Sequence, residues 1–515
     1  MRQERPDAGA GKFDRLAAAV VIVLMLGFTL FLMCSAFFET VDINIANIAG
    51  EQADIVTDNF FLNIIILGLT LAATYLFYRH CDGLTVKALE LVLMLWTLAL
   101  GLGFIASVKL AAPWYSDSYI VTYAARRAAI GDYSALDTYF IRFPFQLGYA
   151  LYEELYFRLT ALIIPGLPEG YYCLGLQCVN LLWLLLGYHA IIRCAELLYS
   201  KARVTKMTAL MLMFCLPAVF SCTFLYGNIP SLACGAAALW MFAEFIKKRR
   251  FASALLCALF MSLAVMLKLN LLIFFAAIAI VWLFELFRRW SFKSLLCLLL
   301  ASLSVLALRG LPQQLYEERS GKSFGEGIPM IAWMAMGFSE GYAGPGWYSM
   351  DHTVTAFTDS GSDPAATAEN ARAVIAERLR YFAEEPGAAW RFFTVKLKTQ
   401  WNDPSYESLW INKVQNTYSE KNGLYQVVCG SGERRTVGFM NQYQQFVLFG
   451  LLLALLTLWK KRDVRSCLLL IVILGGVLYH LLFEAKSQYC LSYFLLMIPV
   501  AASGCCQLFY GVENR

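Results

Sequence analysis

A carboxylate and two lysines stand at the ends of apolar segments in this sequence, where their side chains could take part in a reaction. Asp117 follows an apolar run over residues 88–110 and begins a polar loop. Lys268 ends another apolar run, and Lys486 lies between two of the last ones. A carboxylate can act as a general base toward a hydroxyl group, and a lysine can bind an anion such as phosphate as a point charge. Such chemistry requires a fold that brings these residues together.

The composition is typical of an integral membrane protein. Hydrophobic residues make up 59% of the 515 residues and charged residues only 15%, whereas about a quarter of the residues in a soluble domain are charged. Apolar runs of roughly 17–25 residues recur along the chain, and each is long enough to cross a bilayer as a helix. The net charge of +5 comes mainly from short basic loops, so it indicates membrane topology rather than nucleic-acid binding.

We expect an all-α polytopic membrane protein with about twelve transmembrane helices. The expected spans are residues 16–38, 60–78, 88–110, 171–192, 207–225, 231–246, 252–267, 271–287, 294–308, 445–459, 467–483 and 489–510. Basic loops alternate with acidic or neutral loops along this order. Because cytoplasmic loops carry the excess of Lys and Arg, we place the chain in the plasma membrane with both termini cytoplasmic.

The apolar segment 143–164 is predicted to lie on the membrane surface rather than to cross it. It contains Glu153, Glu154 and Arg158 in mid-run, and placing an acidic or basic side chain in the bilayer centre costs roughly 2.5–3.5 kcal/mol on insertion scales. Its leucines recur at helical spacing on one face. We therefore expect an interfacial amphipathic helix on the outer side, and the alternation of basic loops is consistent only with this placement.

The chain divides at its longest hydrophilic stretch. Residues 1–309 are predicted to form an N-terminal transmembrane module, residues 310–442 an extracytoplasmic hydrophilic region, and residues 443–515 the C-terminal transmembrane helices. Helical periodicity over residues 366–383 and 390–401 predicts surface helices in the middle region. The aromatic and polar segment 400–406 favours ordinary packing of these helices over the stacking of a sugar.

Polar residues near the span ends all fall on the outer side of the predicted topology. They are Asp117, Lys268, Asn270, His480, Glu484 and Lys486. Ionisable residues at this depth are candidates for function. Two of them have structural alternatives: Asp117 could cap a helix that begins near residue 119, and Lys268 could simply extend its ammonium group toward water.

The sequence shows no recognisable metal motif. Most of the fifteen cysteines lie in apolar runs, where cysteine behaves as a small hydrophobic residue, and no Cys-x-x-Cys pair occurs. His480 and Glu484 share a helical face, and Asp351 precedes His352, but neither pair has the spacing of a metal site. We expect no structural metal and no required cofactor. The sequence leaves open whether a divalent cation binds weakly beside a bound phosphate.

Two segments resemble the GT-C membrane glycosyltransferases, in particular bacterial relatives of the protein O-mannosyltransferases and the lipid A aminoarabinose transferase. The first is an apolar span followed by Asp117 in an outer loop and by the segment 143–146, Phe-Pro-Phe-Gln. In this family the acidic residue of the first outer loop is the catalytic base, and a proline-containing segment opens an interfacial helix. The resemblance implies these roles for Asp117 and for the segment that ends in Gln146, although the commoner family form has two prolines.

The second segment precedes the last span. Glu484, Lys486 and Tyr489 are similar to the family's Glu-x-Arg-x-x-Tyr pattern, with lysine where arginine is usual. Lysine can still meet a phosphate, without the bidentate fork of arginine. The resemblance thus implies that Lys486 binds the donor phosphate. Apart from the resemblance, the position of Lys268 at a span end makes it a second candidate for that phosphate, and Asn270 and His480 could support the same site.

The resulting hypothesis is an inverting glycosyltransferase that moves a sugar from a polyprenyl-phosphate donor to a cell-envelope glycan, lipid or protein. Asp117 would be the general base at the extracytoplasmic face. No nucleotide-binding motif is seen, which fits a lipid-linked donor. The alternatives are a transporter or flippase of lipid-linked sugars, a glycan polymerase or ligase of another membrane fold, and a non-catalytic membrane interaction protein. A transporter would need polar residues in the span centres and broken helices in repeated halves.

Overall fold

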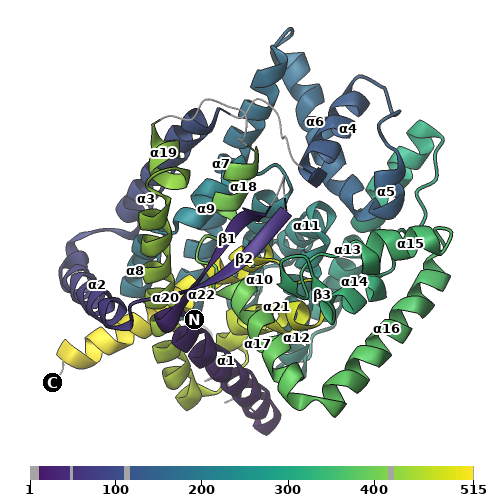
Figure 1. Cartoon of the computed structure of the whole chain (residues 1–515). Helices are drawn as coiled ribbons and strands as arrows, with labels where there is room; N and C mark the ends of the chain where they lie inside the picture. The colour runs from purple at the N-terminus through teal and green to yellow at the C-terminus, as the bar shows by residue number, and fades with distance from the viewer. Residues whose placement is uncertain (1–10, 47–49, 110–115, 416–422, 514–515) are drawn as a thin grey trace.

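The computed structural model describes residues 11–46, 50–109, 116–415 and 423–513, which form mainly α-helices (Figure 1). Ten of these helices are long and apolar enough to cross a membrane. They are α1 (Lys12–Phe38), α2 (Phe60–His80), α3 (Val86–Val108), α7 (Glu169–Tyr199), α10 (Asn228–Lys248), α12 (Leu272–Arg288), α13 (Phe292–Ser320), α20 (Glu433–Lys461), α21 (Leu468–Leu482) and α22 (Ser487–Glu513). Two of them, α12 and α21, reach the length of a span together with the 3₁₀ turns that precede them, η4 (Leu269–Leu271) and η6 (Arg465–Cys467). The predicted all-α, multi-span membrane fold is confirmed.

The two remaining predicted spans take other forms. The span expected at residues 207–225 is broken into α8 (Ala202–Met213), α9 (Leu216–Phe220) and the 3₁₀ turn η3 (Ser221–Thr223), with a bend of 54°. Pro217 lies in the first turn of α9, where it lacks the N–H that would continue the hydrogen bonds of α8. The other, α11 (Phe251–Leu267), is apolar but has only 17 residues.

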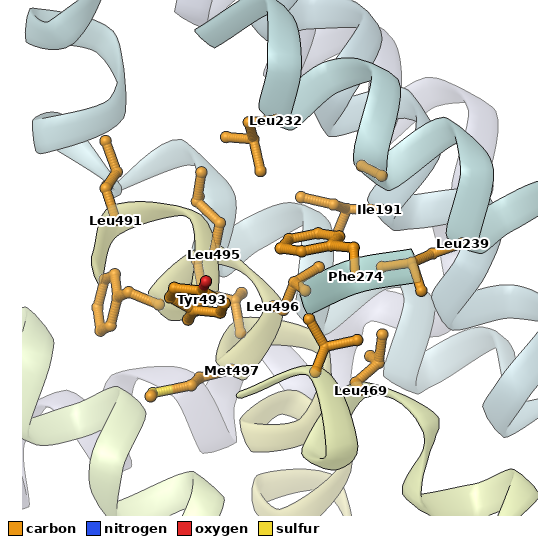
Figure 2. Close-up of a cluster of buried hydrophobic side chains, with 14 of the residues drawn as sticks. Ile191, Leu232, Leu239, Phe274, Leu469, Leu491, Tyr493, Leu495, Leu496 and Met497 are labelled. Atoms are coloured by element: carbon orange, nitrogen blue, oxygen red, sulfur yellow. The ribbon is translucent and has the colours of Figure 1, made fainter. Parts of the chain in front are cut away.

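The core of the bundle lies around α10 and α22. Figure 2 shows side chains of α7, α10, α12, α21 and α22 meeting there, among them Ile191, Leu232, Phe274, Leu469 and Leu496. Close helix contacts depend on small residues. A Cβ atom at Gly504 of α22 would come within 2.1 Å of the carbonyl oxygen of Gly450 on α20, so only glycine allows these two helices their separation.

An antiparallel hairpin replaces the acidic loop expected after α1. Strand β1 (Glu39–Ala46) pairs with β2 (Gly50–Thr57), with Glu39 opposite Thr57 and Ala46 opposite Gly50. The polar segment after α3 is also ordered, as the helices α4 (Ser116–Ala129) and α5 (Thr138–Arg142). Residues 110–115, where the expected outer loop begins, lie outside the described part of the chain.

The segment 143–164 forms the 3₁₀ turn η2 (Pro144–Gln146) and the helix α6 (Leu147–Ile163), which is not among the candidate spans. Its acidic side faces the protein: Thr122 of α4 donates to Glu153 at 3.2 Å, and Arg319 of α13 donates to Glu154 at 3.3 Å. Leu155, Leu159 and Leu162 are exposed on the other side, as a helix at a membrane surface requires.

The hydrophilic stretch folds into short helices next to the bundle. They are α14 (Met330–Gly337), α15 (Ala356–Asp359), α16 (Pro364–Glu384), α17 (Pro386–Trp401), α18 (Ser408–Gln415) and α19 (Leu424–Cys429), with a π-helical turn η5 (Asp351–Thr355) and a small pair of strands, β3 (Glu340–Gly341) and β4 (Gly344–Pro345). The predicted boundaries at residues 309 and 442 fall inside α13 and α20. The division into three parts stays a prediction.

Candidate active site

A cavity of about 1120 Å³ lies where the ends of several helices meet the hairpin and the short helices. Its walls include all eight residues that the sequence singled out. These are Asp117, Gln146, Lys268, Asn270, His480, Glu484, Lys486 and Tyr489. They come from α4, η2, the α11–α12 connection, α21, the α21–α22 connection and α22. The folded chain therefore gathers residues that are up to 372 positions apart, as Asp117 and Tyr489 are.

Asp117 lies in the first turn of α4 and belongs to a chain of hydrogen bonds. Gln146 Nε2 donates to the hydroxyl of Tyr226 at 2.6 Å, and this hydroxyl donates to Asp117 Oδ2 at 2.7 Å. Tyr226 precedes α10 in the loop that ends at Gly227. Gln146 therefore acts on Asp117 through Tyr226, a residue that the sequence analysis did not identify.

Lys268 lies on the other side of Tyr226. Its ammonium group is 4.8 Å from the ring centroid of Tyr226 and 4.8 Å from that of Tyr489, and it donates a hydrogen bond to Asn228 Oδ1. Burial lowers the pKa of Lys268 to about 7, and the negative charge of Glu484 opposes this shift. A buried lysine with two aromatic faces beside it is a place where an anionic ligand would restore the lost charge stabilisation.

The connection between α21 and α22 brings further charges to the cavity. Burial raises the pKa of Glu484 to about 7, although Lys486 works against this shift. Lys486 itself forms an ion pair with Glu51 of strand β2. Lys486 thus lines the cavity, but its charge is already balanced by a carboxylate of the hairpin. The sequence-based hypothesis was that Lys486 binds the phosphate of the donor. The role of Lys486 toward phosphate stays a prediction.

Buried polar residues hold this connection in place. Lys396 of α17 donates to the carbonyl oxygens of Gly337, Leu481 at 3.0 Å and Phe483 at 2.8 Å. His480 Nδ1 lies 3.2 Å from the carbonyl oxygen of Glu484. Because a carbonyl oxygen only accepts, Nδ1 carries the proton in that contact, and Nε2 of the neutral ring is an acceptor.

The first turn of α22 is capped by a carboxylate. Glu407 Oε1 accepts the backbone N–H groups of Ser487 at 2.8 Å and Gln488 at 3.3 Å. A carboxyl oxygen at a helix N-terminus is favourable because it accepts from N–H groups that have no partner within the helix. Burial raises the pKa of Glu407 to about 8, so these hydrogen bonds rather than a negative charge make the cap near neutral pH. This cap fixes the point at which Tyr489 enters the cavity.

Four functional or supporting residues escaped the sequence analysis: Tyr226, Glu51, Lys396 and Glu407. Tyr226 and Glu51 lie in loops or strands for which periodicity gives no orientation. Lys396 had a usable pattern, since it follows Phe392 by four residues on the buried face of α17. A single lysine on an otherwise buried face indicates a hydrogen-bonded anchor.

No group of three or more His, Cys, Asp or Glu side chains with a metal-binding arrangement occurs within the described ranges. The independence from a cofactor stays a prediction.

The fold and cavity define a multi-span helical membrane protein with a polar pocket at the helix ends. No protein-family model matches the chain, and no curated protein matches it. Among solved structures, the chain is similar to the archaeal oligosaccharyltransferase AglB from Archaeoglobus fulgidus, solved in complex with an inhibitory peptide and a dolichol-phosphate, at a TM-score of 0.38 and 12% identity. The match covers 82% of this chain and 51% of the archaeal protein. This chain therefore spans about half the length of the archaeal protein.

Proposed function

We propose that the protein is an integral membrane glycosyltransferase that transfers a sugar from a polyprenyl-phosphate donor to an acceptor hydroxyl. The observation that supports it best is the placement of Asp117 and Lys268 in one cavity, in contact with opposite parts of the same side chain, Tyr226. A base and a buried cation are the two groups that this reaction needs. The resemblance of the first sequence segment to GT-C enzymes assigns the same role to Asp117.

Lys268 binds the phosphate of the donor in this proposal. Asp117 accepts the proton of the acceptor hydroxyl while that oxygen attacks the anomeric carbon. The new bond joins the acceptor oxygen to this carbon, and the bond between the carbon and the phosphate oxygen breaks. Polyprenyl phosphate leaves with the electron pair. Because the acceptor oxygen attacks the anomeric carbon opposite to the departing phosphate oxygen in a single displacement, the configuration inverts.

The rate enhancements that this proposal requires of the base and of the cation are within the usual range for such groups. A positioned general base accelerates proton transfer by about 10²–10⁴-fold. A cation next to the leaving group stabilises charge that develops in the transition state, and it is more effective in a site that excludes water. Tyr226 and Gln146 contribute by holding the carboxylate of Asp117 in one orientation.

The proposal also names the donor, the acceptor and the orientation of the protein in the membrane. The donor is a polyprenyl-phosphate-linked sugar, the acceptor is a glycan, lipid or protein of the cell envelope, and no nucleic acid takes part. The protein lies in the plasma membrane with both termini in the cytoplasm and the cavity on the extracytoplasmic face. The basic loops of the sequence support this orientation.

Purified protein in detergent, incubated with a panel of polyprenyl-phosphate sugars, tests the proposal. We expect release of polyprenyl phosphate from at least one donor, measured by chromatography, and appearance of the sugar on an added acceptor. A chain that binds donors but moves them across a liposome membrane without cleaving them would show a transporter instead.

A further inference from the structure

One face of α13 forms a wall of the cavity next to the membrane. Leu306, Arg309, Gly310 and Gln313 line the cavity, and their spacing of three, four and seven residues places them on one side of the helix. Arg309 is exposed. It lies near the end of the apolar part of α13, which begins at Phe292, so its side chain is at the depth of the lipid headgroups.

The loop between α13 and α14 lies beside this face of α13 and has a fixed conformation. Gln313 Nε2 donates to the carbonyl oxygen of Gly325 at 2.9 Å, and the backbone N–H of Ile328 donates to the carbonyl oxygen of Arg142 at 3.0 Å. Gly327 has φ of +71°, and a Cβ atom there would lie 2.4 Å from Pro144 Cδ. The loop between α13 and α14 is therefore held in place by hydrogen bonds and by one glycine that no other residue can replace without strain.

The cavity has an apolar, exposed rim. Leu306 is 63% exposed, Met330 is 46% exposed and Phe145 is 40% exposed, and all three line the cavity. Large apolar side chains in such positions are favourable only if lipid or a ligand covers them. In a helical membrane protein, a cavity with an apolar rim at headgroup depth opens sideways to the bilayer.

The three cations that line the cavity differ in what already surrounds them. Lys486 is paired with Glu51, and Lys268 is hydrogen bonded to Asn228 and lies near Glu484. Within the described residues, Arg309 forms no ion pair with any carboxylate, including Glu326, which also lines the cavity. An exposed guanidinium of this kind binds phosphate oxygens in a bidentate manner.

We propose that Arg309 binds the phosphate of a polyprenyl phosphate that enters the cavity sideways from the membrane. The isoprenoid tail lies over Leu306, Met330 and the rest of the apolar rim, and the phosphate reaches Arg309 first and Lys268 further inside. This inference rests on the proposed function because it names the entry site of the same donor. The charge of Lys486 is already balanced by an ion pair. Arg309 has no such pair among the residues that the structure describes, so its charge is available to the phosphate.

Native mass spectrometry of the detergent-solubilised full chain can measure the binding. The ligands are a polyprenyl monophosphate, the corresponding polyprenol and inorganic phosphate. We expect Arg309→Gln to weaken binding of the polyprenyl phosphate by about tenfold or more, since a charge-assisted hydrogen bond is lost. Binding of the polyprenol should not change. Inorganic phosphate should bind far more weakly than the lipid, because it has no tail for the apolar rim.

The control is Lys293→Gln, which removes a positive charge from an exposed residue at the other end of α13 and should leave binding unchanged. Arg309→Lys should restore part of the affinity. Equal affinity of wild type and Arg309→Gln for the polyprenyl phosphate would overturn the inference. So would equal weakening by Lys293→Gln.

The proposed function can fail separately. Asp117→Asn should bind the polyprenyl phosphate as wild type does. If Arg309 proves necessary for lipid binding while the wild-type chain cleaves no donor, the glycosyltransferase proposal is wrong and the lipid site stands. If the enzyme is active and Arg309→Gln leaves the donor KM unchanged, only the lipid site is wrong.

Discussion

Tyr226 shows how a single hydroxyl can organise a site. It receives a hydrogen bond from Gln146 and donates one to Asp117, and its ring lies beside the ammonium group of Lys268. A neutral phenol can accept and donate at the same time, so it fixes the carboxylate without adding charge. The aromatic face and the hydroxyl thus serve the two halves of the proposed reaction.

Replacing Tyr226 by phenylalanine should separate these two tasks. We expect kcat of Tyr226→Phe to fall about tenfold, because Asp117 loses a hydrogen bond worth about 1.4 kcal/mol in orientation. The donor KM should stay near the wild-type value, since the ring beside Lys268 is kept. Steady-state transfer assays measure both constants, with Tyr171→Phe, an exposed tyrosine, as the control. An unchanged kcat would remove Tyr226 from the mechanism.

The charge state of Lys268 predicts a pH dependence for donor binding. The pKa of Lys268 is lowered to about 7 by burial and that of Glu484 is raised to about 7. As pH rises through this value, Lys268 loses its positive charge and Glu484 becomes negative. A sugar phosphodiester has no second ionisation, so its charge stays constant. Both changes in the protein therefore weaken the binding of the donor.

The measurement is donor affinity from about pH 6 to pH 8, made with Asp117→Asn so that the donor is not consumed. Affinity should decrease with rising pH in this protein. It should decrease less in a protein that also carries Lys268→Arg, because arginine stays charged throughout. Affinity that rises with pH would show that these two groups do not face the phosphate.

At the scale of elements, the α21–α22 connection is an irregular segment held by buried polar contacts. Lys396 donates to three carbonyl groups around it, and the N–H of Ala485 donates to Gly346 at 2.7 Å. Such contacts position Glu484 and Lys486 although no regular helix contains them. Their loss should therefore affect stability first.

Lys396→Met is expected to lower the free energy of unfolding by about 3 kcal/mol, because three buried carbonyl groups lose their donor. Lys398→Met on the same helix is the matched control. Lys398 pairs with Glu39 in a partly exposed position, where an ion pair contributes about 1 kcal/mol or less. Thermal unfolding in detergent, followed by tryptophan fluorescence, compares the two. Equal midpoints for both variants would contradict the anchoring role of Lys396.

The elements also show what the sequence could and could not predict. Long apolar runs and basic loops located the membrane helices, because hydrophobic length is a property of each segment alone. The acidic residues of 143–164 predicted that α6 would not be a span, and α6 is not among the ten helices that are long and apolar enough to cross a membrane. The hairpin of residues 39–57 was missed, since its acidic residues resemble a solvated loop and its pairing depends on both strands. Tyr226 and Glu51 reach the site only through tertiary contacts, which periodicity cannot supply.

At the scale of the whole molecule, the cavity and the basic loops lie at different ends of the bundle. Glu285 of α12 accepts hydrogen bonds from Arg249 at 2.7 Å and Arg465 at 2.9 Å, and Arg288 pairs with Asp14. Glu285 follows Leu272 at the cavity by thirteen positions of the same helix, which is about 20 Å along the axis. These ion pairs join the ends of α1 and α12 to the α10–α11 and α20–α21 connections, at the end that the positive-inside rule assigns to the cytoplasm.

Cysteine labelling in intact cells tests this orientation. All described native cysteines except Cys34 and Cys178 are buried, so a Cys34→Ser chain gives a low background. With a membrane-impermeant thiol reagent, Asp359→Cys on the cavity side should react, whereas Lys460→Cys should react only after the membrane is opened. Both sites are exposed. Labelling of Lys460→Cys alone in intact cells would reverse the proposed sidedness.

The most direct test of the account is the sugar-transfer rate of Asp117→Asn from a polyprenyl-phosphate donor, compared with wild type and with the exposed-surface control Asp359→Asn. The account predicts a loss of about 10²–10⁴-fold for Asp117→Asn, with unchanged binding of polyprenyl phosphate, and no loss for Asp359→Asn. A transfer rate of Asp117→Asn equal to that of wild type would contradict the assignment of Asp117 as the general base.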